Sequence, residues 1–272
     1  MPGWADETSR QRHSRHRGHR RTSLEFKIAV ARTPGSELSE SLTFTLDGNR
    51  MEAREMVAEH GTRVHLLDSE PGSLHVEYSA SVAGKADSPP VTDYDLSKYL
   101  RPSRYAEADK FFGFTGGEFN LSKPHPELLQ DITTWVGSRL LYQAGSSRST
   151  DSAVDTMLSG AGVCRDFAHL TVALLRAVTI PARLVAVYAP GCDPMDFHAV
   201  VEAFVDHEWR VVDATRLAPR SALLRIATGR DAADTAFLDN HGGAITLENT
   251  VVTAVVDGEF PSDDYATPTS LT

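Results

Sequence analysis

Three side chains in the second half of this 272-residue chain have the types and the order of a thiol-based catalytic group: Cys164, His198 and Asp213. A thiolate is a nucleophile, a histidine can relay its proton, and a carboxylate can hold the imidazole in the useful tautomer. His198 follows Cys164 by 34 residues, and Asp213 follows His198 by 15. The three residues therefore predict acyl chemistry that passes through an acyl-enzyme.

Cys164 stands where a helix is predicted to begin. It follows Gly160–Val163 and opens the run CRDFAHLTVALLRAVTIPAR, in which positions 164, 167, 168, 171, 174, 175 and 178 recur at helical spacing before Pro181. The first turn of a helix presents free backbone N–H groups and a partial positive charge, which favours a thiolate. The Cys164 N–H is also a natural oxyanion donor.

The proposed base and the carboxylate that orients it lie on two segments with the pattern of strands, 197–205 and 209–213. The three residues between them have the length of a hairpin turn. His198 is near the start of the first strand and Asp213 at the end of the second, so antiparallel pairing brings them together. The counts from the turn differ, eight residues against five, so direct opposition requires a bulge or a strong twist.

The remaining pattern divides the chain into three parts. Residues 1–23 are predicted to be a disordered basic tail, 24–92 a small all-β domain, and 93–272 the domain that carries the chemistry. In the β domain apolar residues alternate with polar ones, as at Phe26, Ile28 and Val30. In the last part, helices are predicted over 124–141, 151–158 and from 164 onward. Strands are predicted over 183–189, 197–205, 209–213 and 245–256.

Charge and composition exclude several function classes. The net charge is −10, and the tail contributes six arginines against two acidic residues, so the folded body is more acidic still. This disfavours nucleic acid as a partner, although the tail could touch an anionic surface. Apolar runs such as 184–189 are far shorter than the ~20 residues that cross a membrane.

The expected compartment is the cytoplasm. Arg20-Arg21 could open a twin-arginine signal, but Glu25, Lys27 and Arg32 interrupt the apolar stretch that a signal requires. Two cysteines do not make a disulfide framework, so each is expected to be a free thiol.

A zinc site is the alternative to a catalytic thiol. Cys164, Cys192, His198 and Asp213 offer four ligands of the right type, but structural zinc sites usually contain close pairs such as C-x₂₋₄-C. No such pair occurs, so no metal is expected, and Cys192 is interpreted as an ordinary thiol. Glu202 is expected either to pair with Arg183 or Arg210 or to line the groove.

The run GAGVCRDFAHLTVALLRAVTIPARLVAVY, then His198 with Glu202, then WRVVDAT, closely resembles the transglutaminase-like superfamily of cysteine enzymes. The segments YLRPSRYAEAD and RIATGRDAADTAF are similar to its bacterial branch with an extra N-terminal β domain. The resemblance runs from about Leu24 to Pro261. It implies an α+β fold, a papain-like transglutaminase core whose nucleophile helix packs on an antiparallel sheet, with Cys164, His198 and Asp213 as the triad. Val200 departs from the aromatic residue that many members have there.

The resemblance also implies an activity. Bacterial relatives are generally regarded as proteases, so a peptidase or amidase acting on a peptide or protein is expected. A protein-glutamine amine transferase and a non-catalytic peptide-binding module remain open. No cofactor is implied, and no loop has the D-x-D-x-D spacing of an EF-hand. The second oxyanion donor is expected to be Tyr142 or Trp135, against the alternative that each only packs in the core. The oligomeric state is not predicted.

Overall fold

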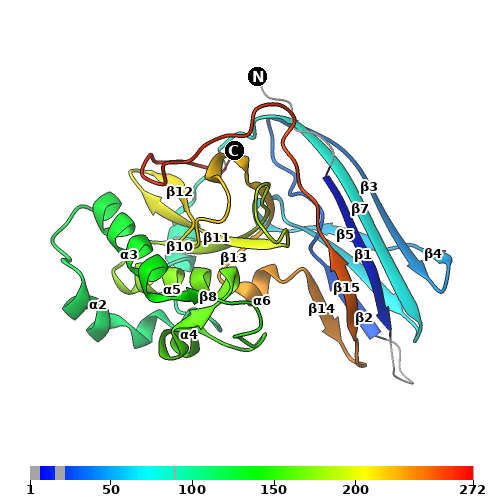
Figure 1. The fold of residues 1–272 in the computed structure, drawn as a ribbon, viewed down its shortest axis with the longest axis horizontal. Coiled ribbons are helices and arrows are strands. Elements are labelled where there is room, and N and C mark those ends of the chain that lie inside the picture. The colour runs from blue at the N-terminus through cyan, green and yellow to red at the C-terminus, as the bar shows by residue number, and fades with distance from the viewer. Residues whose placement is uncertain (1–6, 16–21, 89, 272) are drawn as a thin grey trace.

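The centre of the fold is a four-stranded antiparallel sheet that helix α5 (Cys164–Ala177) covers on one face (Figure 1). The structure is a computed structural model, and it describes residues 7–15, 22–88 and 90–271. In spatial order the strands of this sheet are β12 (Glu208–Val212), β11 (His198–Val205), β10 (Ala182–Tyr188) and β13 (Leu224–Gly229). Alternation explains the packing, because Ala199, Val201 and Ala203 of β11 lie in the same core cluster as Leu170 and Leu174 of α5.

Shorter elements surround this layer and complete its core. They are α1 (Asp93–Lys98), η2 (Ala108–Lys110), α2 (Phe112–Glu118), α3 (His125–Arg139), β8 (Leu141–Tyr142), α4 (Ala153–Ser159), β9 (Ala161–Gly162), η3 (Arg220–Ala222) and α6 (Ala232–Thr235). The three predicted helices correspond to α3, α4 and α5. The N-cap of α4 is Ser152, because the Ser152 and Asp155 side chains form a reciprocal capping box. Among the described residues no helix is long and apolar enough to cross a membrane.

A second unit consists of two antiparallel sheets around a second core cluster with Phe26, Phe44 and Val76, which Tyr188 and Ile226 of the central sheet also join. One sheet has the order β15 (Leu247–Val251), β1 (Glu7–Arg15), β7 (Ser73–Gly84), β3 (Ser36–Leu46) and β4 (Asn49–Met51). The other has the order β14 (Leu238–His241), β2 (Thr22–Phe26), β6 (Arg63–Ser69) and β5 (Arg54–Val57), and the short η1 (Glu59–Gly61) precedes β6.

The β unit is not confined to residues 24–92, the range predicted for the small all-β domain. The strands β14 and β15 come from beyond the central sheet and pair with β2 and β1. The predicted strand 245–256 is therefore shorter, Leu247–Val251, and belongs to the β unit. The chain leaves the β unit, builds the layer with α5, and returns.

The prediction of a disordered tail over 1–23 is wrong for Glu7–Arg15, which form β1 between β7 and β15. This segment lacks the apolar alternation that marks a strand, and backbone pairing on both of its edges places it instead. Residues 1–6 and 16–21 lie outside the described residues, and Thr22 already belongs to β2.

The last segment of the chain, after β15, crosses to the central sheet and follows its outer strand β12 (Figure 1, red). The Val211 N–H of β12 donates to the Thr269 carbonyl at 2.8 Å. Leu271 is buried in a small core cluster with Val187 and Val200. The outer edge of β12 is therefore covered, and the turn that follows β12 lies close to the C-terminal segment.

Candidate active site

Cys164 is the first residue of α5, at the end of the helix that carries the partial positive charge. The Asp166 carboxylate caps this end, because its Oδ2 accepts the Val163 N–H at 2.8 Å and the Ser147 hydroxyl at 2.5 Å. A Cβ on Gly162 would lie 2.6 Å from the Asp166 Cβ, so only glycine fits there. The cap and the glycine fix the turn that presents the thiol, which is partly exposed.

The first residue of β11, His198, meets Asp213 directly after β12. The His198 Nε2 and the Asp213 Oδ2 are 2.8 Å apart, and both side chains are buried. The β11–β12 register pairs Val201 with Val212, so one further step would put Asp213 opposite Val200. His198 lies two residues before Val200, so its side chain is on the same face of the sheet. His198 and Asp213 are therefore diagonal neighbours and not directly opposite, and their side chains meet across the two strands.

The Cys164 thiol completes the group. Its sulfur is 3.9 Å from the carbonyl oxygen of Phe197, the residue before His198, and the Cys164 side chain also lies within hydrogen-bonding reach of the imidazole. Since Nε2 faces Asp213, Nδ1 is the ring nitrogen left for the thiol. The structure thus brings the three predicted residues together in the order thiol, imidazole, carboxylate.

Charge pairing decides the protonation of this group. Burial alone would lower the pKa of His198, but the Asp213 carboxylate and the neighbouring Cys164 raise that pKa well above its usual value. Burial would raise the pKa of Asp213, yet His198 and the Thr215 donors hold it below its usual value. A protonated imidazole beside an ionised carboxylate is the favoured state at neutral pH.

The two expected oxyanion side chains have different surroundings. Tyr142 lies on β8, whose partner β9 leads directly into Cys164, and Tyr142 pairs with Gly162 in register. Burial and the nearby thiol groups raise the pKa of the Tyr142 phenol, while a hydrogen bond from the Cys164 backbone N–H opposes the rise. The phenol therefore lies beside the N–H that was predicted to bind an oxyanion.

Trp135, the other candidate, is held elsewhere. Its indole N–H donates to Glu118 at 2.6 Å, and its ring packs against Phe114 and Phe119. The packing alternative describes Trp135, because its one side-chain donor is already used by Glu118. In the sequence Trp135 belongs to the apolar stripe of α3, and that pattern does not distinguish a packing residue from an oxyanion donor.

Glu202 is a structural partner and does not line the groove. Its carboxylate is fully buried between Arg183 and Arg225, each at 2.7 Å, and these two guanidinium groups lower the pKa of Glu202 to about 2 against the effect of burial. Arg183 was expected, Arg225 was missed, and Arg210 pairs with Glu208 instead.

The second thiol, Cys192, is buried in a loop before β11, and burial raises its pKa. Its electrostatic neighbours are His198, Cys164, Asp213 and Asp196, so it lies near the candidate active site without belonging to the hydrogen-bonded group. Across the described ranges no three or more His, Cys, Asp or Glu side chains gather as a metal site would require.

Thr215 was not predicted from the sequence, although it lies in the quoted run WRVVDAT. Its N–H and its hydroxyl both donate to the Asp213 Oδ1, at 2.8 and 2.6 Å. A threonine two residues after an aspartate is the available signal, because such a pair commonly closes a local side-chain turn.

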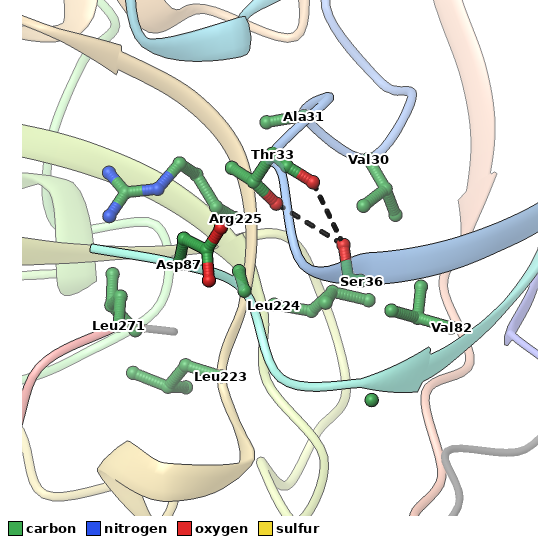
Figure 2. A pocket seen from close by; sticks show the side chains of 12 residues that line it. Val30, Ala31, Thr33, Ser36, Val82, Asp87, Leu223, Leu224, Arg225 and Leu271 are labelled. Atoms are coloured by element: carbon green, nitrogen blue, oxygen red, sulfur yellow. Dashed lines mark hydrogen bonds between the residues drawn. The ribbon is translucent and has the colours of Figure 1, made fainter. Parts of the chain in front are cut away.

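A small cavity of about 30 Å³ lies elsewhere, at the seam between the β unit and the central sheet (Figure 2). Val30 and Val82 line it from the β unit, and Leu223 and Arg225 line it from the other side. It has room for about one water molecule and contains none of the three predicted catalytic residues.

Comparison with known proteins identifies the family. The model of the transglutaminase-like superfamily matches residues 115–214, which include Cys164, His198 and Asp213. A crystal structure described as a candidate cysteine protease from Cytophaga hutchinsonii superposes with a TM-score of 0.85 at 32% identity. The match covers 97% of this chain and 95% of that one. The chain belongs to the transglutaminase-like superfamily.

The resemblance inferred from the sequence and the α+β fold that it implied are thereby confirmed. Two mycobacterial proteins of unknown function match more distantly. The first, from Mycobacterium leprae, is 26% identical over 151 residues, and the second, from Mycobacterium tuberculosis, is 28% identical over 142. The matched stretch is 53% and 52% of this chain, but only 54% and 39% of the two relatives. This superfamily member therefore spans about half of their length or less.

Proposed function

We propose that this protein is a cysteine-dependent acyl-transfer enzyme that hydrolyses peptide or amide bonds. The observation that supports the proposal most is the buried 2.8 Å contact between His198 and Asp213, with the Cys164 thiol beside the imidazole at a helix N-terminus. The nucleophile Cys164 has a base beside it, and the base His198 has a carboxylate that orients its ring.

In the proposed first step the Cys164 thiolate attacks the carbonyl carbon, forming a C–S bond and an oxyanion. The Cys164 N–H and the Tyr142 hydroxyl donate to that oxyanion. The oxyanion then collapses, the C–N bond breaks, and the His198 Nδ1 proton passes to the departing amine. The products are a free amine and a thioester at Cys164.

In the second step His198, now neutral, takes a proton from water, and the resulting hydroxide attacks the thioester carbon. The C–S bond breaks, the carboxylic acid leaves, and the thiolate–imidazolium state returns. An amine in place of water would make the protein a transferase. Hydrolysis is preferred because the Cytophaga relative is described as a candidate protease.

The first experiment compares the two thiols. We expect iodoacetamide to label Cys164 much faster than Cys192, and His198→Ala to remove the difference, because Cys192 is buried and its pKa is raised. Peptide mass spectrometry reports both sites in one sample, so Cys192 is the internal control. Equal and slow labelling of both thiols contradicts the proposal.

The second experiment separates the reactions. The protein is incubated with a peptide library that includes glutamine, with and without a labelled primary amine, beside Cys164→Ala. We expect new peptide termini that depend on Cys164 and no incorporated amine. Incorporated amine without cleavage would identify a transferase. Peptide binding without any acyl-enzyme would identify a binding module.

A further inference from the structure

The Asp213 carboxylate is held at both of its oxygens. Oδ2 contacts the His198 ring at 2.8 Å, and Oδ1 accepts two hydrogen bonds from Thr215, at 2.8 Å from the N–H and 2.6 Å from the hydroxyl. The carboxylate is buried, so water does not supply substitutes for these donors. Thr215 is therefore the residue that sets the rotation of the carboxylate.

The turn that carries Thr215 is fixed from two sides. On one side the Ala214 carbonyl approaches α3 so closely that a Cβ on Gly137 would lie 2.6 Å from its oxygen. On the other side the Tyr265 hydroxyl donates to the Arg216 and Ala218 carbonyls, at 3.1 and 3.3 Å. The main chain at residue 215 thus has little freedom to follow a rotating carboxylate.

The two Thr215 donors differ in what they control. The N–H belongs to the fixed main chain and remains whatever side chain is present. The hydroxyl is the shorter contact to a charged acceptor, and hydrogen bonds to charged groups are stronger than those between neutral groups. Without the hydroxyl, one donor is lost from a buried carboxylate and its rotation about Cβ–Cγ is less restricted.

We propose that Thr215 is a positioning residue, which orients the Asp213 carboxylate and through it the His198 ring. This rests on the proposed function, in which His198 must present one tautomer to Cys164. Both hydrogen bonds that Thr215 donates end on the Asp213 carboxylate, so its effect passes through that group.

Three variants test the proposal. Thr215→Val keeps the shape and removes the hydroxyl, and Thr215→Ser restores the hydroxyl on a smaller side chain. Thr235→Val is the matched control, because its hydroxyl also donates to a buried position, the Asp231 carbonyl, but in α6. We expect Thr215→Val to lower kcat about 10- to 100-fold with little change in KM, Thr215→Ser to recover most of the loss, and Thr235→Val to resemble the wild type.

Two measurements distinguish a positioning role from simple destabilisation of the fold. The first is the acid limb of the pH–activity profile, and the second is the NMR signal of the imidazole protons. Loss of the hydroxyl raises the pKa of Asp213, so the acid limb shifts to higher pH in Thr215→Val alone. The downfield NMR signal of the His198 Nε2 proton, observed in the full chain, should shift or broaden in Thr215→Val and return in Thr215→Ser.

Failure of this inference differs from failure of the proposed function. If the wild type is active and Thr215→Val has the same kcat, acid limb and Nε2 signal, Thr215 does not position Asp213. If the wild type neither labels nor cleaves, but the Nε2 signal responds to Thr215→Val, the positioning role stands and the enzyme function is wrong.

Discussion

Replacing Asp213 by asparagine is the most direct test of how the catalytic group is held. The side chains have the same shape, so the carbonyl of the new amide could keep both Thr215 donors that now reach the Asp213 Oδ1. The amide would then turn its NH₂ toward the His198 Nε2, where the carboxylate oxygen had been 2.8 Å away. A donor facing Nε2 requires that nitrogen to be unprotonated, which moves the ring proton to Nδ1, beside the thiol.

The consequence is a neutral imidazole that cannot accept the thiol proton. In the thiolate–imidazolium state the substitution removes the carboxylate beside the imidazolium, which raises the free energy of that state by about 3–5 kcal/mol. At 1.36 kcal/mol for each factor of ten, this corresponds to a decrease in kcat of about 10²- to 10⁴-fold. A decrease in the middle of that range is expected, because the proposed oxyanion donors, the Cys164 N–H and Tyr142, remain in place.

The assay measures the rate of Cys164 alkylation and peptide hydrolysis in a Cys192→Ser background, so that one thiol reports. Asp234→Asn is the control, since Asp234 also pairs with a cation, Arg230, but on the surface. A decrease of less than tenfold in Asp213→Asn, with the alkylation rate unchanged, would refute the role given to the carboxylate.

Further predictions concern residues around the site. Cys192→Ser should leave alkylation of Cys164 within about twofold of the wild type, because Cys192 makes no hydrogen bond to the catalytic group; a lost acyl-enzyme in mass spectrometry would contradict this. Glu202→Gln should lower the free energy of unfolding in urea by about 3–5 kcal/mol, since it leaves two arginines buried without a counter-charge. Tyr265→Phe should lower kcat less than Thr215→Val does, because it loosens the turn but keeps both donors to Asp213; an equal or larger loss in steady-state kinetics would contradict this order.

Local pattern was sufficient to predict the elements that carry the catalytic group. Cys164 stands between a glycine-rich turn and an apolar helical stripe, and α5 begins at that residue. His198 opens a segment of alternating side chains that forms β11. Because the two strands form a hairpin, Asp213 at the end of the second strand was expected beside His198 at the start of the first.

Long-range pairing was not predictable in the same way. The polar strand β1 has no apolar face in its sequence, and its two neighbours, β7 and β15, lie far along the chain. Arg225 reaches Glu202 because β13 lies beside β10 in the sheet, an order that no local pattern encodes. Tyr142 and Trp135 are both aromatic residues near one helix, and only the β8–β9 pairing separates them.

The pair formed by His198 and Asp213 should stabilise the fold within a limited pH window. Because the pKa of His198 is raised in the folded state, its contribution is complete below the unfolded value near 6.5 and declines as pH rises toward the raised value. The pKa of Asp213 is lowered, so its contribution is complete above about 4 and declines as pH falls toward the lowered value.

The difference in free energy of unfolding between the wild type and His198→Ala should therefore be largest between about pH 4 and pH 6.5. Urea unfolding at one-unit steps from about pH 3 to pH 9 measures it, with the exposed His125→Ala as the control. A flat difference would show that the pKa of His198 is not raised on folding, and growth above about pH 6.5 would show that it is lowered. In both cases the imidazole would be mostly neutral above about pH 7. The thiol would then need to lose its proton during attack instead of before it, because no imidazolium would stand ready to stabilise a thiolate.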